Sequence, residues 1–228
     1  MVDELVEAPK PPLKLDLACG QGCKDGFVGV DMAPTPAAKY VFNLLKFPWP
    51  FEDNSVEEIH CSHFIEHIPM AFIGKDGQYR LVPETHDDQD LFFAFFDECH
   101  RILKHFGKMT VFCPASASDR AFQDPTHRRF ITDITFNYLS KKWRSDTGLS
   151  HYNVKANFGN QLQYSTIPWQ KCVAPGEIAA ARVAEVQQRM FKHYRNYIND
   201  WVCVLMAIKK DVTLPEFEAE LKAKNEAK

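Results

Sequence analysis

Apolar and polar residues alternate in short runs along the first third of the chain. Alternation with a period of two is typical of β-strands with one buried face. It predicts strands at about residues 13–18, 27–31, 39–44 and 56–62. Only about nine residues separate the first two strands, fewer than the helical crossover that usually joins parallel strands requires. We therefore expect the first crossover to lack a helix.

The period changes to three and four positions from residue 90 to 105, which predicts an amphipathic helix. Asp88 or Asp90 is placed to cap its first turn. A second helical stripe at about 176–199 is suited to cover the sheet face left by the short first crossover, or to pair with a second copy of the chain, which leaves a homo-oligomer open. Further strands are predicted at 108–113, 157–167 and 201–208.

Together these elements predict an α/β fold with a doubly wound, mostly parallel, Rossmann-like sheet that ends in an antiparallel strand pair. We expect a single domain over residues 13–210, preceded by a leader at 1–12 and followed by a charged tail at 211–228. Two insertions interrupt this domain, at about 68–89 and 115–200. The first is long enough to be a functional loop.

Composition narrows the class of protein. The 228 residues are 45% hydrophobic, enough for one sizeable core, and the net charge of −3 gives no basic excess that would favour nucleic acid as a partner. The seven cysteines are odd in number and scattered, which indicates reduced thiols. There is no apolar run of about 18 residues, and the acidic, proline-rich N-terminus is unlike a signal peptide. We therefore expect a cytoplasmic protein with no membrane partner.

The segment LKLDLACGQG, residues 13–22, places glycines directly after a buried strand. Glycines there let the backbone approach a ligand closely, and Asp31 at the end of the next strand can accept the hydroxyls of a ribose. The third glycine of a dinucleotide-binding loop is missing. Asp16 would also repel a pyrophosphate, whereas a carboxylate suits a cationic group such as an amino acid ammonium. The ligand implied is a nucleoside that carries a positive charge.

The segment LDLACGQG, followed by VGVDM, resembles motif I and the second-strand acid of class I S-adenosylmethionine-dependent methyltransferases. It is most similar to the compact bacterial and phage, type-11-like forms. The likeness continues through DNSVEEIHCSHFIEHIP at 53–69 and RILKHFGKMTVFCP at 101–114, and it covers roughly residues 13–114. The resemblance implies S-adenosyl-L-methionine as the cofactor and a methyltransferase activity, with an acceptor that it does not identify.

Residue by residue, the resemblance implies a cofactor site in several parts. The first strand and its loop would hold the methionine part, Asp31 the ribose and Asn43 the adenine edge, where the family usually has aspartate. Residues after the fourth strand would approach the sulfonium. The complete set of predicted cofactor-binding residues is Asp16, Ala18, Cys19, Gly20, Gly22, Asp31, Met32, Asn43, Leu44, Ser62, His63 and Glu66.

Two histidines are the candidate catalytic bases, required only if the acceptor must lose a proton. His67 follows the fourth strand and would face or support the methyl-transfer cavity. His127 lies in DPTHRR, just beyond the carboxyl end of the predicted fifth strand, where open α/β sheets bind ligands. Arg128 and Arg129 are the candidate substrate-binding residues, because guanidinium groups bind carboxylates and phosphates bidentately. A small-molecule acceptor is favoured.

Two alternatives stay open. Ala18 and Asn43 stand where the family often has glycine and aspartate, so the chain could be a non-catalytic nucleoside-binding protein of the same fold. His63 to His67 also match HxxEH, the motif of inverted zinc proteases, which would make the protein a zinc hydrolase. That motif needs a long regular helix, yet Pro69 follows it by two residues. We therefore assign none of the site residues to a metal.

Overall fold

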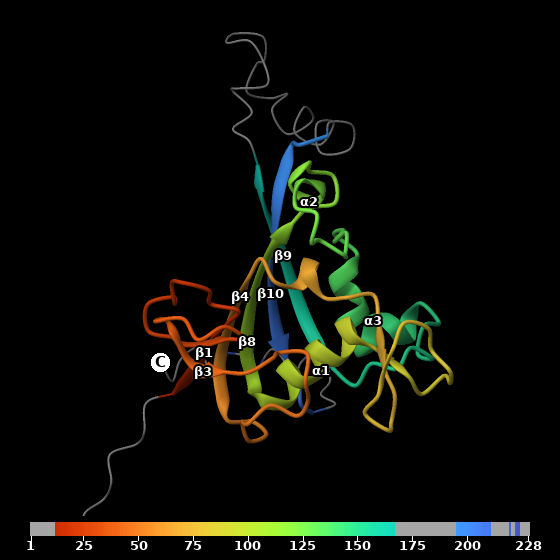
Figure 1. Cartoon of the computed structure of the whole chain (residues 1–228). Coiled ribbons are helices and arrows are strands. Elements are labelled where there is room, and N and C mark those ends of the chain that lie inside the picture. Colours follow the sequence, from red (N-terminus) through yellow and green to blue (C-terminus); the bar gives the residue numbers. More distant parts are fainter. Residues whose placement is uncertain (1–11, 167–194, 211–218, 220–221, 224–228) are drawn as a thin grey trace, which may run out of the picture.

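The computed structural model describes residues 12–166, 195–210, 219 and 222–223. A seven-stranded sheet crosses it in the order β3-β2-β1-β4-β8-β10-β9 (Figure 1). Its strands are β1 (Leu13–Leu17), β2 (Val28–Asp31), β3 (Ala38–Val41), β4 (Val56–Ser62), β8 (Leu103–Pro114), β9 (Phe158–Thr166) and β10 (Ile198–Ala207). Neighbouring strands are parallel except that β10 runs antiparallel to both β8 and β9. The predicted mostly parallel α/β sheet with an antiparallel pair at its end is confirmed.

The crossovers among the first strands contain no helix: turns and loops join β1, β2, β3 and β4. The expected short first crossover is thus confirmed. Strand β3 ends at Val41, earlier than predicted, because its pairing with β2 stops there and the chain then turns. The backbone oxygen of Asn43 closes that turn by accepting a hydrogen bond from Lys46 N at 3.0 Å.

The longest described helix, α1 (Leu91–Ile102), begins at a capping aspartate as predicted. The Asp90 side chain accepts a hydrogen bond from Phe92 N at 2.8 Å. The helix ends at Ile102 rather than at about residue 105, because Leu103 is already extended and starts β8. Gly107 therefore lies inside a strand. A β-carbon there would lie 2.9 Å from the Lys104 carbonyl oxygen, so the backbone passes too close for any other residue.

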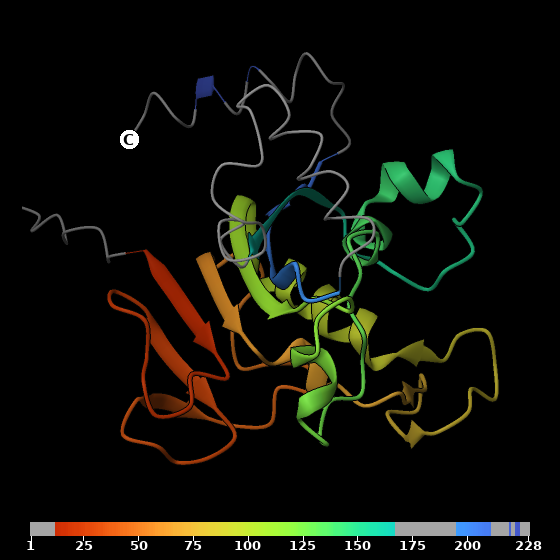
Figure 2. The ribbon, with the colours of Figure 1, turned by 90° about the horizontal axis from the view of Figure 1, so that it is seen from above.

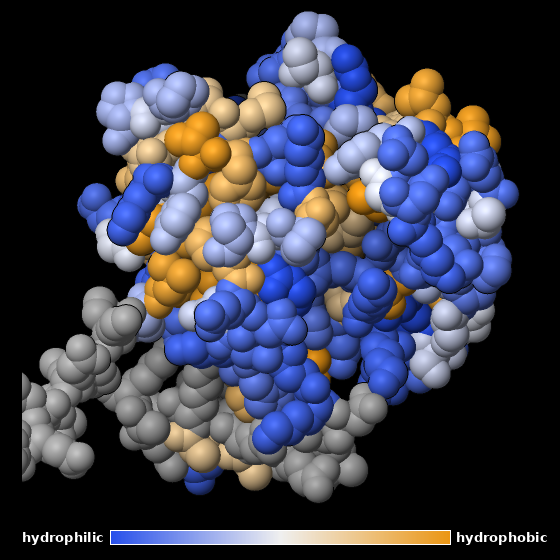
Figure 3. Space-filling model, turned by 60° about the horizontal axis from the view of Figure 1, so that its bottom comes forward, coloured by the Kyte–Doolittle hydropathy of each residue, from blue (hydrophilic) through white to orange (hydrophobic). Residues whose placement is uncertain are grey.

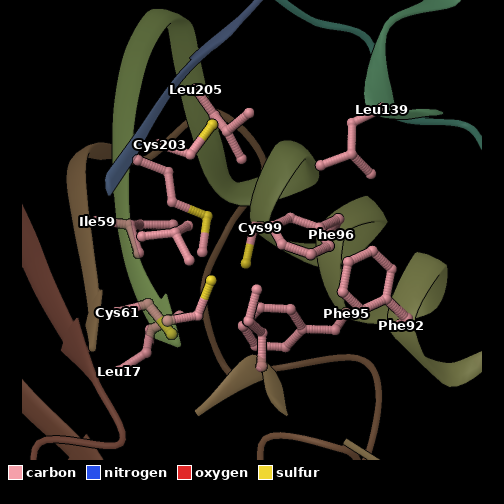
Figure 4. Close-up of a cluster of buried hydrophobic side chains, with 14 of the residues drawn as sticks. Leu17, Ile59, Cys61, Phe92, Phe95, Phe96, Cys99, Leu139, Cys203 and Leu205 are labelled. Carbon is pink, nitrogen blue, oxygen red and sulfur yellow. The ribbon is translucent and has the colours of Figure 1, made fainter. Parts of the chain in front are cut away.

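Helix α1 packs against one face of the sheet. Its Phe95, Phe96 and Cys99 are fully buried and point toward strand residues such as Ile59 and Cys203 (Figure 4). The aromatic residues between prolines at 47–51 join the same core, since Trp49 and Phe51 are buried there. This loop is therefore packed against the core.

Residues 68–90 form a small second sheet in place of a plain loop. Its strands, in the order β6-β5-β7, are β5 (Phe72–Ile73), β6 (Tyr79–Arg80) and β7 (Gln89–Asp90). Figure 2 shows this insertion, in yellow, on the opposite side of the molecule from β1, β2 and β3. The short helices are η1 (Ile65–His67), α2 (Arg120–Gln123), η2 (Thr135–Leu139) and α3 (Lys141–Asp146).

Other predicted segments lie outside the described residues: most of the 176–199 helix, most of the 1–12 leader and most of the tail. The face seen in Figure 3 is mostly hydrophilic, with apolar side chains in a few small groups. Within the described part of the chain, no helix has the length and apolar character needed to cross a membrane.

Candidate functional site

The glycine loop after β1 is held by hydrogen bonds to β2 and to the segment that follows it. Gly20 has a φ of +56°, which favours glycine, and its N–H donates to Asp31 Oδ2 at 2.8 Å. The Thr35 hydroxyl donates to the Gly20 carbonyl oxygen at 2.5 Å. A β-carbon at Gly29 of β2 would lie 2.2 Å from Ala37 O and 2.8 Å from Cys19 Sγ. Glycine at position 29 therefore lets the loop, β2 and β3 approach one another.

Asp16 lies at the base of this loop and is 4% exposed. Its Oδ1 is 2.7 Å from His60 Nδ1, and its Oδ2 accepts a hydrogen bond from Lys24 N at 2.7 Å. His60 was not among the residues predicted from the sequence. The signal that could have found it is strand register, since Asp16 of β1 pairs directly with His60 of β4 and both side chains leave the sheet on the same face.

A cavity of about 500 Å³ opens beside the loop at the carboxyl ends of β1 and β4. A β-carbon added at Gly20 or Gly22 would meet no atom within 4 Å, so the loop backbone faces open space there. The cavity brings together several of the predicted cofactor residues with three that were not predicted. It is lined by Asp16, Ala18, Cys19, Gly22, Cys23, Lys24, His60 and Ser62.

The remaining predicted residues of the β2 and β3 ends lie outside the lining of this cavity. Asp31 accepts backbone hydrogen bonds on both carboxylate oxygens, from Gly20 and, at 2.9 Å, from Ala33. Met32 is 68% exposed, and Leu44 is buried in the core. Asn43 Oδ1 accepts a hydrogen bond from Leu45 N at 2.8 Å, so that oxygen is already shared with the backbone.

After β4 the chain makes a strained turn into η1. His63 has a φ of +54°, a conformation that is uncommon for a residue with a side chain and is often found at functional sites. Its Nδ1 lies 3.2 Å from Glu66 Oε1, and this hydrogen bond raises the pKa of His63. Glu66 is only 1% exposed, and its Oε2 has no hydrogen-bond partner among the residues that the structure describes.

The two candidate bases lie together. The rings of His67 and His127 pack edge to face with centroids 4.7 Å apart. The segment that carries His127 is fixed on η1, because the N–H groups of Arg128 and Arg129 donate to the Glu66 carbonyl oxygen at 2.7 and 3.0 Å. Two segments about sixty residues apart in sequence thus meet at this point.

The two arginines differ in their surroundings. The Arg129 guanidinium donates to the carbonyl oxygens of Ile68 and Pro69 and forms an ion pair with Asp90 at 2.9 Å. These contacts give Arg129 a structural task, which is to tie the insertion to the start of α1. Arg128 is exposed, and its guanidinium donates to the Pro125 carbonyl oxygen at 2.7 Å.

A second, mostly apolar cavity of about 350 Å³ borders Arg129. It begins three residues after His67 along the chain, at the exposed Met70. Its aromatic side chains come from α1, from residues 130–131 and from η2. The lining residues are Met70, Phe92, Phe93, Arg129, Phe130, Ile131, Thr135 and Tyr138.

Comparison with known proteins places the fold. A crystal structure of an S-adenosylmethionine-dependent methyltransferase from Archaeoglobus fulgidus aligns with a TM-score of 0.54 at 16% sequence identity, over 86% of each chain. A weaker likeness, with a TM-score of 0.47 and 13% identity, links 89% of the chain to 84% of a putative methyltransferase from Haloferax volcanii, solved in complex with the Trm112 activator. No family model and no curated protein matches the sequence.

The likeness to the Archaeoglobus fulgidus structure, together with the strand order, shows that the chain has the class I methyltransferase fold. The fold class predicted from the glycine loop and the ordered motifs is therefore confirmed. The type-11-like subtype and the roles of the individual site residues stay predictions.

Proposed function

We propose that this protein is an S-adenosylmethionine-dependent methyltransferase whose acceptor is a small molecule. The observation that carries the proposal is the glycine loop bound to Asp31 beside an open cavity, at the carboxyl ends of β1 and β4, in a chain with this fold. In open α/β sheets, ligands bind at this end of the strands.

The residues present fit the cofactor. Each Asp31 oxygen accepts one backbone hydrogen bond, and because a carboxylate has about four acceptor positions, two remain for the ribose hydroxyls. The buried Asp16 carboxylate lines the cavity and would attract the ammonium of the methionine part. Gly20 and Gly22 leave room for close approach. When bound, the cofactor supplies a methyl group on a sulfonium, which is an electrophile.

The chain's own contribution is positioning, which can supply most of the acceleration of a transfer between two bound groups. The apolar cavity, lined by Met70 and Arg129 shortly after His67 and His127 in the chain, would hold the acceptor, and its aromatic lining favours an acceptor with an apolar part. The two histidines are placed to take a proton if the acceptor must lose one. Arg128, exposed beside them, could bind an acidic group of the acceptor.

The free thiols of the six described cysteines, four of them fully buried, support the cytoplasm as the place of the reaction. The first crossover, which has no helix between β1 and β2, supports the type-11-like subtype. Both belong to the same proposal.

The proposal is tested by calorimetric titration of the protein with S-adenosylmethionine and with S-adenosylhomocysteine. Wild type should bind both, and Asp31→Ala should weaken binding by at least about tenfold, since the ribose hydroxyls lose a charged acceptor. Asp25→Ala, at an exposed aspartate of the same loop, is the matched control and should bind like wild type.

Absence of binding by correctly folded wild-type protein would overturn the proposal. Binding that Asp31→Ala leaves unchanged would keep the cofactor but place it elsewhere in the structure. If wild type binds the cofactor and Asp31→Ala weakens that binding, the next step is a screen of small acceptors with a radiolabelled methyl donor.

A further inference from the structure

Glu66, His67 and His127 form a cluster outside the lining of the cofactor cavity, although Glu66 is among the cofactor-binding residues predicted from the sequence. One ligand atom from each, a carboxylate oxygen and two ring nitrogens, lie within 4.8 Å of one another. Glu66 and His67 come from η1, whereas His127 comes from the loop after α2. Two imidazoles and one carboxylate are the donor set of many catalytic zinc sites and of other open metal sites.

The neutral ring of His127 is held in the tautomer that metal binding needs. Its Nδ1 lies 3.0 Å from the Ala121 carbonyl oxygen, which can only accept a hydrogen bond. Nδ1 must therefore carry the proton, and in the neutral ring Nε2 then carries the lone pair. A histidine that ligates a metal through one nitrogen commonly donates its other N–H to a backbone carbonyl in this way.

The neutral ring of His67 is fixed in the same tautomer through the Thr126 hydroxyl. The Thr126 hydroxyl donates its single proton to Asp124 Oδ1 at 2.7 Å, so the hydroxyl oxygen must accept from His67 Nδ1, 3.0 Å away. Nε2 of His67 is then also left with its lone pair. Asp124 lies beyond Thr126 as the carboxylate that orients the ring, an arrangement that recurs behind metal-binding histidines.

Glu66 provides an independent sign of a missing partner. Its side chain is 1% exposed, and within the described part of the chain its buried Oε2 forms no hydrogen bond. An unpartnered buried carboxylate oxygen is costly, because it loses its hydration and gains nothing in return. A cation bound between this carboxylate and the two imidazoles would remove that cost.

We propose that Glu66, His67 and His127 bind a divalent first-row transition metal ion, through the carboxylate and the two Nε2 atoms. The ligand atoms that are farthest apart must close in by at least about 0.6 Å, since atoms bound to one such ion at about 2.1 Å are no more than about 4.2 Å apart. Imidazole ligands favour ions such as Zn²⁺ or Mn²⁺ over Mg²⁺. This departs from the expectation of no metal drawn from the sequence.

The site differs from that of the HxxEH zinc proteases. There both histidines of the motif bind the ion, whereas here His63 lies before η1 with a left-handed backbone, and its Nδ1 is directed to Glu66 Oε1. The described helix at this point covers only Ile65–His67, too short to align positions 63 and 67 on one face. His127, distant in sequence, takes the place of the first histidine.

Three protein ligands leave coordination positions open, which is typical of catalytic rather than structural sites. Because Met70 and Arg129 of the apolar cavity follow the two histidines by no more than three residues in the chain, an open position suits an oxygen of the acceptor, such as a hydroxyl. Only this use of the ion rests on the proposed methyltransferase function. With the ion bound, the two histidines are its ligands and no longer act as bases.

The test is calorimetric titration of metal-free protein with Zn²⁺ and Mn²⁺, and with Mg²⁺ for comparison, in the absence of S-adenosylmethionine. Wild type should bind one transition metal ion per chain. His127→Ala and Glu66→Gln should each weaken binding by more than about tenfold, and Thr126→Val, which removes the orienting hydroxyl, by about tenfold. His86→Ala, at a histidine whose side chain is 93% exposed, should bind like wild type.

Circular dichroism shows whether each variant folds, and because Glu66 is buried, the exposed Thr126 and the half-buried His127 keep the test valid if Glu66→Gln unfolds. No metal binding by wild type, or binding unaffected by His127→Ala, would overturn the proposal. Loss in His63→Ala without loss in His127→Ala would assign the ion to the HxxEH pair and overturn it equally. Since cofactor binding is titrated separately, failure here leaves the methyltransferase proposal standing.

Discussion

At the scale of single residues, the glycines around the loop serve two different purposes. Gly29 is packed: a β-carbon there would overlap the Ala37 carbonyl oxygen and contact Cys19 Sγ. Gly22 faces the open cavity, where a β-carbon would meet nothing within 4 Å, and its φ lies outside the left-handed region. The two positions therefore separate what holds the fold from what leaves room for a ligand.

We expect Gly29→Ala to lower the free energy of unfolding by about 1–3 kcal/mol, since a crowded methyl group must push backbone aside. Gly22→Ala should leave the unfolding free energy within about 0.5 kcal/mol of wild type but weaken S-adenosylhomocysteine binding. Urea denaturation and calorimetry measure the two quantities. Equal stability of both variants would contradict the packing role of Gly29, and unchanged affinity in Gly22→Ala would move the ligand away from this loop.

The sequence did not predict residue roles that depend on neighbouring strands or on distant segments. The alternation of β4 places His60 on a sheet face, but only its register opposite Asp16 brings the two side chains together. The position of His127 beside η1 depends on the hydrogen bonds from the N–H groups of Arg128 and Arg129 to the Glu66 carbonyl oxygen. These residues are distant in sequence, and no local pattern relates them. By contrast, the bond of Gly20 to Asp31 follows from a strand–loop–strand motif whose parts are adjacent in the chain.

At the scale of elements, long periodic segments were predicted well and their ends less so. The stripe that predicts α1 continues to residue 106, since Ile102 and Phe106 fit both a helix and a buried strand. The structure switches to β8 at Leu103 because strand pairing with Val56 begins there. Asp90 was identifiable because a cap needs only local backbone N–H groups.

One contact between α1 and the end of β10 makes stability depend on pH. His100 Nε2 lies 3.2 Å from the Ile208 carbonyl oxygen, and burial, assisted by the nearby Lys209 charge, lowers the pKa of His100 to about 4. In the unfolded chain His100 has a pKa of about 6.5, so between pH 6.5 and 4 it is protonated in the unfolded state but not in the folded state. The stabilising effect is therefore complete above pH 6.5 and is lost as the pH falls toward 4.

Over that window we expect His100 to account for a loss of up to about 3 kcal/mol in the free energy of unfolding. His100→Gln, which does not titrate, should flatten the decline between pH 6.5 and 4, as measured by urea denaturation at several pH values. His86→Gln, at an exposed position, is the control and should keep the wild-type slope. An unchanged slope in His100→Gln would mean that the ring is solvated and protonates normally.

At the scale of the whole molecule, the site joins two halves of the chain. The loop and Asp31 belong to the first strands, whereas the histidine cluster and apolar cavity need segments from residue 66 to 138. The first part was predictable because its motifs are contiguous. In the second part the sequence identified His67 and His127 as candidates, but not their contact with each other, because that contact is long-range. Strands β1 and β4 contribute side chains to the hydrophobic core. A ligand that binds at the ends of these strands should therefore stabilise the entire fold.

A ligand that binds only the folded chain raises the free energy of unfolding by about 2.7 kcal/mol at one hundred times its dissociation constant. For a chain of this size we therefore expect S-adenosylhomocysteine to raise the melting temperature by roughly 5–10 °C. At the same ligand concentration the gain should fall by about half or more in Asp31→Ala, whose binding is at least about tenfold weaker because the ribose contact is lost. NAD⁺ at the same concentration should give no shift, because its pyrophosphate would approach the buried Asp16 carboxylate. A melting-temperature shift with NAD⁺ that equals the shift with S-adenosylhomocysteine would contradict the cofactor assignment. A full shift with S-adenosylhomocysteine in Asp31→Ala would mean that the ligand binds apart from the β2 end.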